Sequence, residues 1–225
     1  VGISPFGLTM TPNISLIIIN RFSIFYGGDQ AVAVYACISY IICIVYLIFQ
    51  GVGDGSQPII SRYYGEKSLV RLKKIRKLAY GCGIILAAVS CVILYGTRDL
   101  IGILFGSSAE VNAQIGGILP IFLISVPFVA VTRVTTASFY AIEESILSYI
   151  LTYIEPVLML LLMLVLPPLF GGQIMIWWST VIARILAAVG KDMPVSLASF
   201  TGGAKMNAIV SEADAVIVVP AGKAA

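Results

Sequence analysis

Six apolar stretches, each close to the length of a membrane-spanning helix, constrain the fold of this chain more than any other feature. They cover residues 5–26, 30–50, 78–95, 111–140, 146–166 and 173–189. A helix needs about 20 apolar residues to cross about 30 Å of hydrocarbon. The fourth stretch is longer than this and the sixth is shorter, so we expect tilting or partial burial there. The pattern predicts an all-α membrane protein with six transmembrane helices.

The composition supports a membrane protein and argues against an enzyme. Of the 225 residues, 59% are apolar and 11% are charged, and the mean hydropathy is +1.01. Soluble domains are about half apolar and a quarter charged. Histidine, the commonest metal ligand and general base, is absent. The four cysteines lie in apolar stretches without C-x-x-C spacing, which is typical of buried apolar side chains. We therefore expect no catalytic residues, no metal ligands and no cofactor.

A basic segment sets the expected orientation in the membrane. Six of the fourteen Lys and Arg residues lie within 67–77. Short cytoplasmic loops carry an excess of Lys and Arg, so we place this loop in the cytoplasm. Alternation of the spans then puts the chain start, Glu143 and the C-terminus there too, and leaves Arg98 as the only basic residue of the outer loops. Nucleic-acid binding is the rival use of such a run, but apolar spans flank it. The prediction is a multi-pass protein of the cell inner (plasma) membrane, with membrane lipid and no nucleic acid as a partner.

Polar residues inside the apolar stretches are candidates for a substrate or ion pathway. They are Asn20, Gln50, Arg133 and Glu155. A charge at the middle of a transmembrane helix costs about 2.5–3.5 kcal/mol, so such residues are normally paired or functional. Counting about 1.5 Å per residue along antiparallel helices favours an ion pair between Arg133 and Glu155, with Arg184 as a second possible partner. The pair can be purely structural, or Glu155 can exchange protons along a pathway. Asn20 can line a cavity or lie near the headgroups.

The glycine-rich motif QGVGDGSQP at 50–58 carries the structural residues Gly51, Gly53, Gly55, Gln57 and Pro58. A phosphate-binding loop would need a preceding strand and a following Lys-Ser/Thr, and both are missing. Small residues four apart allow two helices to approach closely, as Gly51 and Gly55 would. We expect the motif to end the second span and to pack against a neighbouring helix.

Three segments together resemble a known transporter family. They read GISPFGLTMTPNISLIIIN at 2–20, YGGDQAVAVYACIS at 26–39 and QGVGDGSQPIISRYYGEK at 50–67. Their order and spacing resemble the second half of multidrug and toxic compound extrusion (MATE) transporters, with the S-P-F start, the G-G-D turn and the G-x-G-x-G-x-Q-P pattern. FYAIEES at 139–145 is similar to a later loop of the family, and the resemblance covers about 2–189.

The resemblance implies a cation-coupled antiporter, with H⁺ or Na⁺ as the coupling ion, that exports amphipathic and often cationic drugs or toxic compounds. Such transporters have twelve helices in two lobes that face a central cavity. This chain resembles only the second lobe, so a missing N-terminal lobe or a second copy would form the other wall. Some members carry acidic residues in the first and fourth helices of this lobe and near the position of Arg184, and this sequence departs from them there.

The C-terminal residues have a different character. LASFTGGAKMNAIVSEADAVIVVPAGK at 197–223 resembles a short piece of aminoacyl-histidine dipeptidases, with Val210 where that family has Pro. We therefore predict a MATE-like transmembrane lobe at 1–190 and a soluble, partly β-structured fragment at 191–225 that does not fold alone. One hypothesis is that a truncated transporter reading frame is fused to a dipeptidase fragment. Alternatives are a product without transport activity of its own, or a peptidase, against which the absence of His argues.

Overall fold

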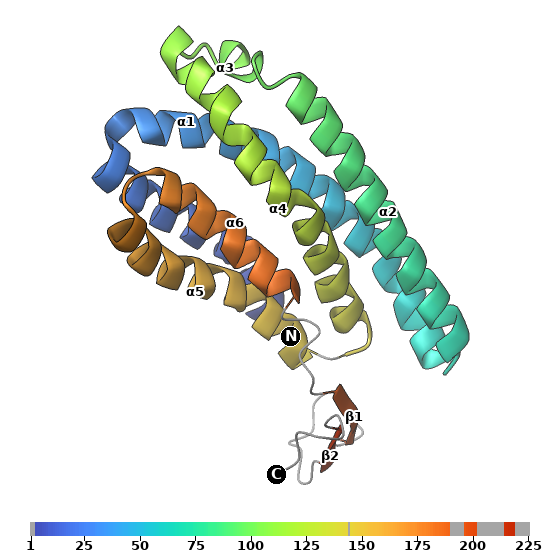
Figure 1. The fold of residues 1–225 in the computed structure, drawn as a ribbon. Helices are drawn as coiled ribbons and strands as arrows, with labels where there is room; N and C mark the ends of the chain where they lie inside the picture. The colour runs from blue at the N-terminus through green and yellow to red at the C-terminus, as the bar shows by residue number, and fades with distance from the viewer. Residues whose placement is uncertain (1–2, 144, 190–195, 202–213, 219–225) are drawn as a thin grey trace. The chain divides into compact units, whose positions relative to one another are not determined.

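The computed structural model describes residues 3–143, 145–189, 196–201 and 214–218. The chain divides into two compact units, Val1–Ala188 and Val189–Ala225. Within the described residues, the first unit is helical and the second contains a pair of β-strands (Figure 1).

The helices of the first unit follow the predicted apolar stretches closely. They are α1 (Ile3–Gly65), α2 (Leu69–Gly96), α3 (Ile101–Leu104), α4 (Ala109–Ala141), α5 (Ser145–Phe170) and α6 (Ile174–Val189). By length and composition, α1, α2, α4 and α5 can each cross a membrane, and α6 is an apolar helix of 16 residues. The chain is therefore a multi-pass, all-α membrane protein.

The first two predicted spans are joined in one element, α1. Gly28 is the one residue of α1 with non-helical backbone angles, with φ of 65° and ψ of −163°. The ribbon turns back at this end of α1, so the helix has a first arm before Gly28 and a second arm after it (Figure 1). The positive φ is readily adopted only by glycine. The six predicted apolar stretches are confirmed as helices, two of them as the arms of α1 and the sixth as the short helix α6.

Replacing Gly28 with alanine should lower the free energy of unfolding by about 1–2 kcal/mol, because a Cβ at positive φ collides with the backbone. A suitable control is Gly117→Ala in α4, where an added Cβ has no heavy atom within 4 Å. That change should be neutral or stabilise the helix by about 0.5–1 kcal/mol. Thermal unfolding in detergent, followed by circular dichroism, measures both variants. Equal stability of Gly28→Ala and the wild type would contradict the role of this turn.

The predicted helix end at 50–58 is wrong. The second arm of α1 continues through the glycine-rich motif and Pro58 to Gly65, and α2 begins at Leu69. The basic segment 67–77 therefore forms mostly the first turns of α2 and not a loop. Glycine weakens a helix by only about 1 kcal/mol relative to alanine, and contacts with a neighbouring helix offset this. The Ser56 hydroxyl also donates to the Gly53 carbonyl oxygen at 2.8 Å within the motif.

The close helix approach expected of the motif occurs at Gly53. A Cβ added to Gly53 would lie 3.1 Å from Ala137 Cβ and 3.4 Å from the Arg133 carbonyl oxygen, both on α4. Gly51 and Gly55 have nothing within 4 Å of an added Cβ in the described part of the chain. The second arm thus packs closely against α4 at Gly53. Gly51 and Gly55, the pair expected to allow this approach, do not face α4 in the described part of the chain.

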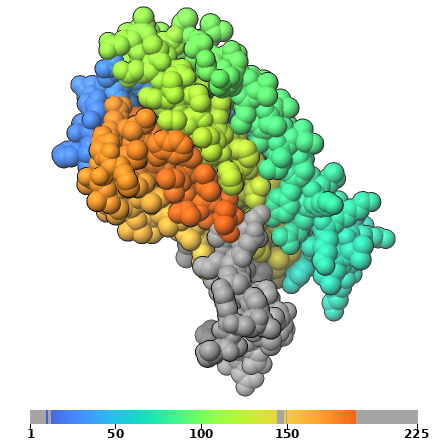
Figure 2. Space-filling model, in the orientation of Figure 1, coloured from blue at the N-terminus to red at the C-terminus, as the bar shows by residue number. Residues whose placement is uncertain are grey.

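An aromatic cluster holds α1, α4 and α6 together. Tyr35 of the second arm stacks on Trp177 of α6 with ring centroids 5.6 Å apart, and Trp177 lies 5.7 Å from Phe122 of α4. All three side chains are buried. Such ring pairs contribute about 0.5–1.5 kcal/mol each beyond the burial of their area. Figure 2 shows α6 between α5 and α4 on one face of the lobe.

The second unit contains the antiparallel strands β1 (Ser196–Thr201) and β2 (Asp214–Val218), with an irregularity in the register between Leu197 and Ser199. The predicted β character of this region is confirmed. The predicted boundary at 190 and the dipeptidase-like GGAKMNAIV at 202–210 lie outside the described residues. The assignment of 191–225 to a dipeptidase fragment stays a prediction.

Candidate functional site

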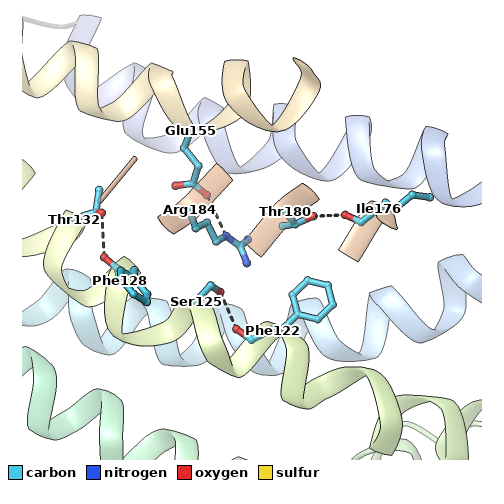
Figure 3. A network of polar contacts seen from close by, with 8 residues as sticks. All are labelled: Phe122, Ser125, Phe128, Thr132, Glu155, Ile176, Thr180 and Arg184. Carbon is cyan, nitrogen blue, oxygen red and sulfur yellow. Dashed lines mark hydrogen bonds and ion pairs between the residues drawn. The ribbon is translucent and has the colours of Figure 1, made fainter. Parts of the chain in front are cut away.

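A partly buried ion pair joins α5 and α6. Arg184 Nε lies 3.2 Å from Glu155 Oε1, and the two side chains are 9% and 24% exposed. Figure 3 shows the two side chains pointing toward one another from their helices. The structure therefore pairs Glu155 with Arg184, the second partner suggested by the sequence, and the pairing of Glu155 with Arg133 is wrong.

Arg184 and Tyr46 keep hydrogen-bonding capacity beyond this pair. The Arg184 guanidinium carbon lies 5.2 Å from the ring centre of Tyr46 on the second arm of α1. Arg184 Nη1 and the Tyr46 hydroxyl are buried and have no hydrogen-bond partner among the described residues. Ser125 of α4 lies nearby in Figure 3 and donates to the Phe122 carbonyl oxygen at 2.7 Å. Buried polar groups normally have a partner, so this cluster is able to take a water molecule or a polar group of a ligand.

A second polar group lies at a small pocket of about 110 Å³ formed by the second arm of α1 and by α4. The pocket is lined by Gln50, Asp54, Gln57, Arg133, Thr136, Ala137 and Tyr140. Arg133 Nη1 donates to Gln50 Oε1 at 3.4 Å, and Gln50 Nε2 donates to Asp54 Oδ1 at 2.9 Å. The Gln50 amide therefore bridges a guanidinium and a carboxylate. Two of the predicted pathway residues, Gln50 and Arg133, are brought together here.

Asp54 was not among the residues singled out from the sequence. The glycine-rich motif predicted that the helix ends near Gln50, which places Asp54 in a loop. In the continuous helix, Asp54 lies one turn after Gln50, where side chains four residues apart face each other. The four-residue spacing of Gln50 and Asp54 predicts a contact between their side chains only if this part of the chain is helical.

The ion pair and the pocket lie beside the same face of the second arm. Tyr46 and Gln50 are four residues apart on this helix and therefore lie on the same face, about 6 Å apart along the axis. We call the set Glu155, Arg184, Tyr46, Gln50, Arg133 and Asp54 the polar path. Asn20 is half-buried on the first arm, and no hydrogen bond joins it to the polar path within the described residues.

The polar path has one carboxylate at each end. In the described ranges, no group of three or more Cys, Asp and Glu side chains is positioned to hold a metal ion. Glu155 at one end is paired with Arg184, and Asp54 at the other end accepts a hydrogen bond from Gln50.

Comparisons with known proteins identify the fold. The MatE family model matches residues 6–165. Among solved structures, the outward-facing conformation of a multidrug resistance MATE family transporter of the MOP superfamily is 19% identical, with a TM-score of 0.75 over 84% of this chain and 42% of that chain. The inward-facing conformation of a multidrug resistance MATE family transporter of the MOP superfamily is 18% identical, with a TM-score of 0.75 over 84% of this chain and 44% of that chain. No curated protein matches the sequence significantly.

A third structure belongs to a MOP superfamily transporter from Pyrococcus furiosus Vc1, in which a reversed polarity of the binding pocket suggests a different function. It is 19% identical, with a TM-score of 0.79 over 84% of this chain and 43% of that chain. At this level of identity the likeness establishes the fold alone. The chain spans a little over two fifths of the length of these structures.

Proposed function

Because the chain belongs to the MatE family, we propose that it acts as one lobe of a two-lobe exporter, which exchanges a cation for drugs or toxic organic compounds across the membrane. The observation that supports this best is the partly buried Glu155–Arg184 pair inside a lobe with the MATE fold. In this proposal the partly buried Glu155 carboxylate takes up H⁺ or Na⁺, and the cation competes there with the Arg184 guanidinium.

In this proposal, cation uptake at Glu155 changes how α5 and α6 pack. With Glu155 ionised, its carboxylate and the Arg184 guanidinium compensate each other's charge inside the lobe. When a proton or Na⁺ neutralises Glu155, Arg184 loses that compensation, and a different arrangement of α6 becomes favourable. A cation that binds one arrangement better than the other shifts the population between them. Drug binding to the opposite arrangement then gives exchange.

The second wall of the cavity comes from outside this chain in the proposal, either from an N-terminal lobe or from a second copy. The chain covers about 42–44% of the two-lobe structures that it resembles. The basic segment 67–77 and the C-terminus face the cytoplasm, and the membrane is the cell inner (plasma) membrane. Small amphipathic cations are the proposed substrates.

Glu155→Gln should remove most of the export that an H⁺ or Na⁺ gradient drives, because the amide does not take up a cation. The Gln Oε1 atom can still accept the hydrogen bond from Arg184 Nε, so the local geometry is retained. Release of a fluorescent cationic dye from proteoliposomes, holding this lobe together with its partner lobe, measures the effect under each gradient.

Glu110→Gln is the matched control, because Glu110 is exposed at the start of α4, in its first turn. It should export at the wild-type rate. Unchanged export and unchanged pH dependence in Glu155→Gln would exclude Glu155 as the coupling group. Absence of dye movement under both gradients, with the wild-type protein folded, would favour an assembly subunit without transport activity.

A further inference from the structure

The start of α2 carries a large excess of positive charge. Between Asp54 and Leu78 the sequence holds seven basic residues, and Glu66 is the one acidic residue. Glu66 is already engaged, because its carboxylate lies 2.9 Å from Arg62 Nε and 3.9 Å from Arg71 Nη1. The Lys side chains at 73, 74 and 77 are exposed and have no ion-pair partner among the described residues. The local charge of this surface is therefore not balanced within the lobe.

Two of these basic residues continue an apolar stripe on the outer face of α2. Leu78, Ile85 and Val92 are seven residues apart and are 68%, 65% and 74% exposed. Seven residues are nearly two helical turns, so the three side chains lie on one face. Arg71 and Lys74 precede Leu78 by seven and four residues, which puts them on the same face. Leu72, Ala79, Gly83 and Ala87 are buried on the opposite face, against the lobe.

The length of the stripe also indicates how deep in the bilayer Arg71 and Lys74 lie. Leu78 and Val92 are about 21 Å apart along the helix axis, which fits within the hydrocarbon thickness of about 30 Å. Lys74 and Arg71 lie about 6 and 10 Å beyond Leu78 along the same face. With the stripe centred in the hydrocarbon, Leu78 lies about 4–5 Å inside the boundary, so Lys74 and Arg71 lie about 2 and 6 Å outside it, within a headgroup layer of about 5–8 Å.

We propose that Arg71 and Lys74, the basic end of this stripe, bind the phosphate of an anionic phospholipid whose acyl chains lie along Leu78, Ile85 and Val92. A lipid fits better than a protein partner, because the basic residues and the lipid-exposed stripe share one helix face. An anionic headgroup fits because, in the described part of the lobe, the one carboxylate beside these basic residues, that of Glu66, is already paired. Tyr63, whose ring centre lies 5.9 Å from the Arg71 guanidinium carbon, keeps that side chain at the interface. This binding does not depend on the proposed transport.

Native mass spectrometry of the full chain in a neutral detergent tests the proposal by titration with phosphatidylglycerol and with phosphatidylcholine. We expect the wild type to prefer phosphatidylglycerol. In Arg71→Gln/Lys74→Gln the preference should fall by about 30-fold, since each basic residue near an anionic surface contributes about fivefold. Both side chains are exposed, so the variant should keep its fold, which gel filtration and circular dichroism verify.

The control Arg21→Gln/Arg98→Gln removes the same charge from the other end of the lobe and should keep the preference. The charge-retaining variant Arg71→Lys/Lys74→Arg should keep it as well. Equal binding of the two lipids by the wild type would overturn the proposal. So would a preference that survives in Arg71→Gln/Lys74→Gln, one that is lost equally in the control, or displacement of phosphatidylglycerol by an equimolar amount of inorganic phosphate.

Discussion

Arg184→Met should lower the free energy of unfolding by about 3 kcal/mol, because it leaves the Glu155 carboxylate largely buried and without its partner. The guanidinium of Arg184 supplies the ion pair at 3.2 Å and also packs over the Tyr46 ring, and methionine retains only part of that packing. Thermal and denaturant unfolding in detergent, followed by circular dichroism, give the change in stability.

The double variant Arg184→Met/Glu155→Leu separates loss of charge compensation from loss of packing. Replacement of a whole buried ion pair by apolar side chains is often neutral or stabilising, so the double variant should return to within about 1 kcal/mol of the wild type. Arg98→Met is the surface control, because Arg98 and Asp99 form a more exposed pair at 3.7 Å, which contributes less than about 1 kcal/mol. A double variant as unstable as Arg184→Met would mean that packing, and not charge, accounts for the loss.

Gly53→Leu should destabilise the lobe by about 2 kcal/mol, because it forces a large side chain into the contact between the second arm of α1 and α4. Even a Cβ at this position would lie 3.1 Å from Ala137 Cβ, and the rest of the leucine has to displace α4. The same shift would disturb the Arg133–Gln50 hydrogen bond, which lies across this contact. Unfolding in detergent measures the stability.

Gly51→Leu and Gly55→Leu are matched controls in the same motif. Neither position has a heavy atom within 4 Å of an added Cβ in the described part of the lobe, and leucine is a better helix former than glycine by somewhat less than the difference of about 0.8–1 kcal/mol between alanine and glycine. Both variants should therefore be as stable as the wild type or slightly more stable. Equal destabilisation at all three positions would show that backbone flexibility of the motif matters, and not the contact at Gly53.

The sequence predicted the spans well because hydrophobicity along the chain determines them directly. Apolar length located α2, α4, α5 and α6 to within a few residues at most ends, and Gly28 marked the turn between the arms of α1. The error at 50–58 arose because glycine and proline are local signals for a helix end. Contacts with α4 decide the outcome there, and these depend on residues more than 75 positions away, such as Arg133 and Ala137.

The sequence predicts how deep each polar side chain of the candidate site lies in the membrane. It does not predict how each helix is rotated about its own axis. Counting residues along a helix places Arg133, Glu155 and Arg184 at compatible depths, but it does not determine which face of each helix points inward. Arg133 therefore pairs with Gln50 across the pocket, and Arg184 takes Glu155. Tyr46 was missed because a tyrosine in an apolar span has the pattern of an ordinary core or interface residue. The transport roles of Asn20, Gln50, Arg133 and Glu155 stay predictions.

The second arm of α1 is a long helix without a break, so a tilt at one end would produce a larger displacement at the other. From Gly28 to Gly65 the arm is about 55 Å long, well beyond the hydrocarbon thickness of about 30 Å. A tilt of about 10° around the Gly28 pivot would sweep its far end through roughly 10 Å, while residues near the pivot would hardly move. In such a tilt Gln50 and Asp54 would move further than Tyr35, because they lie further from Gly28 along the helix.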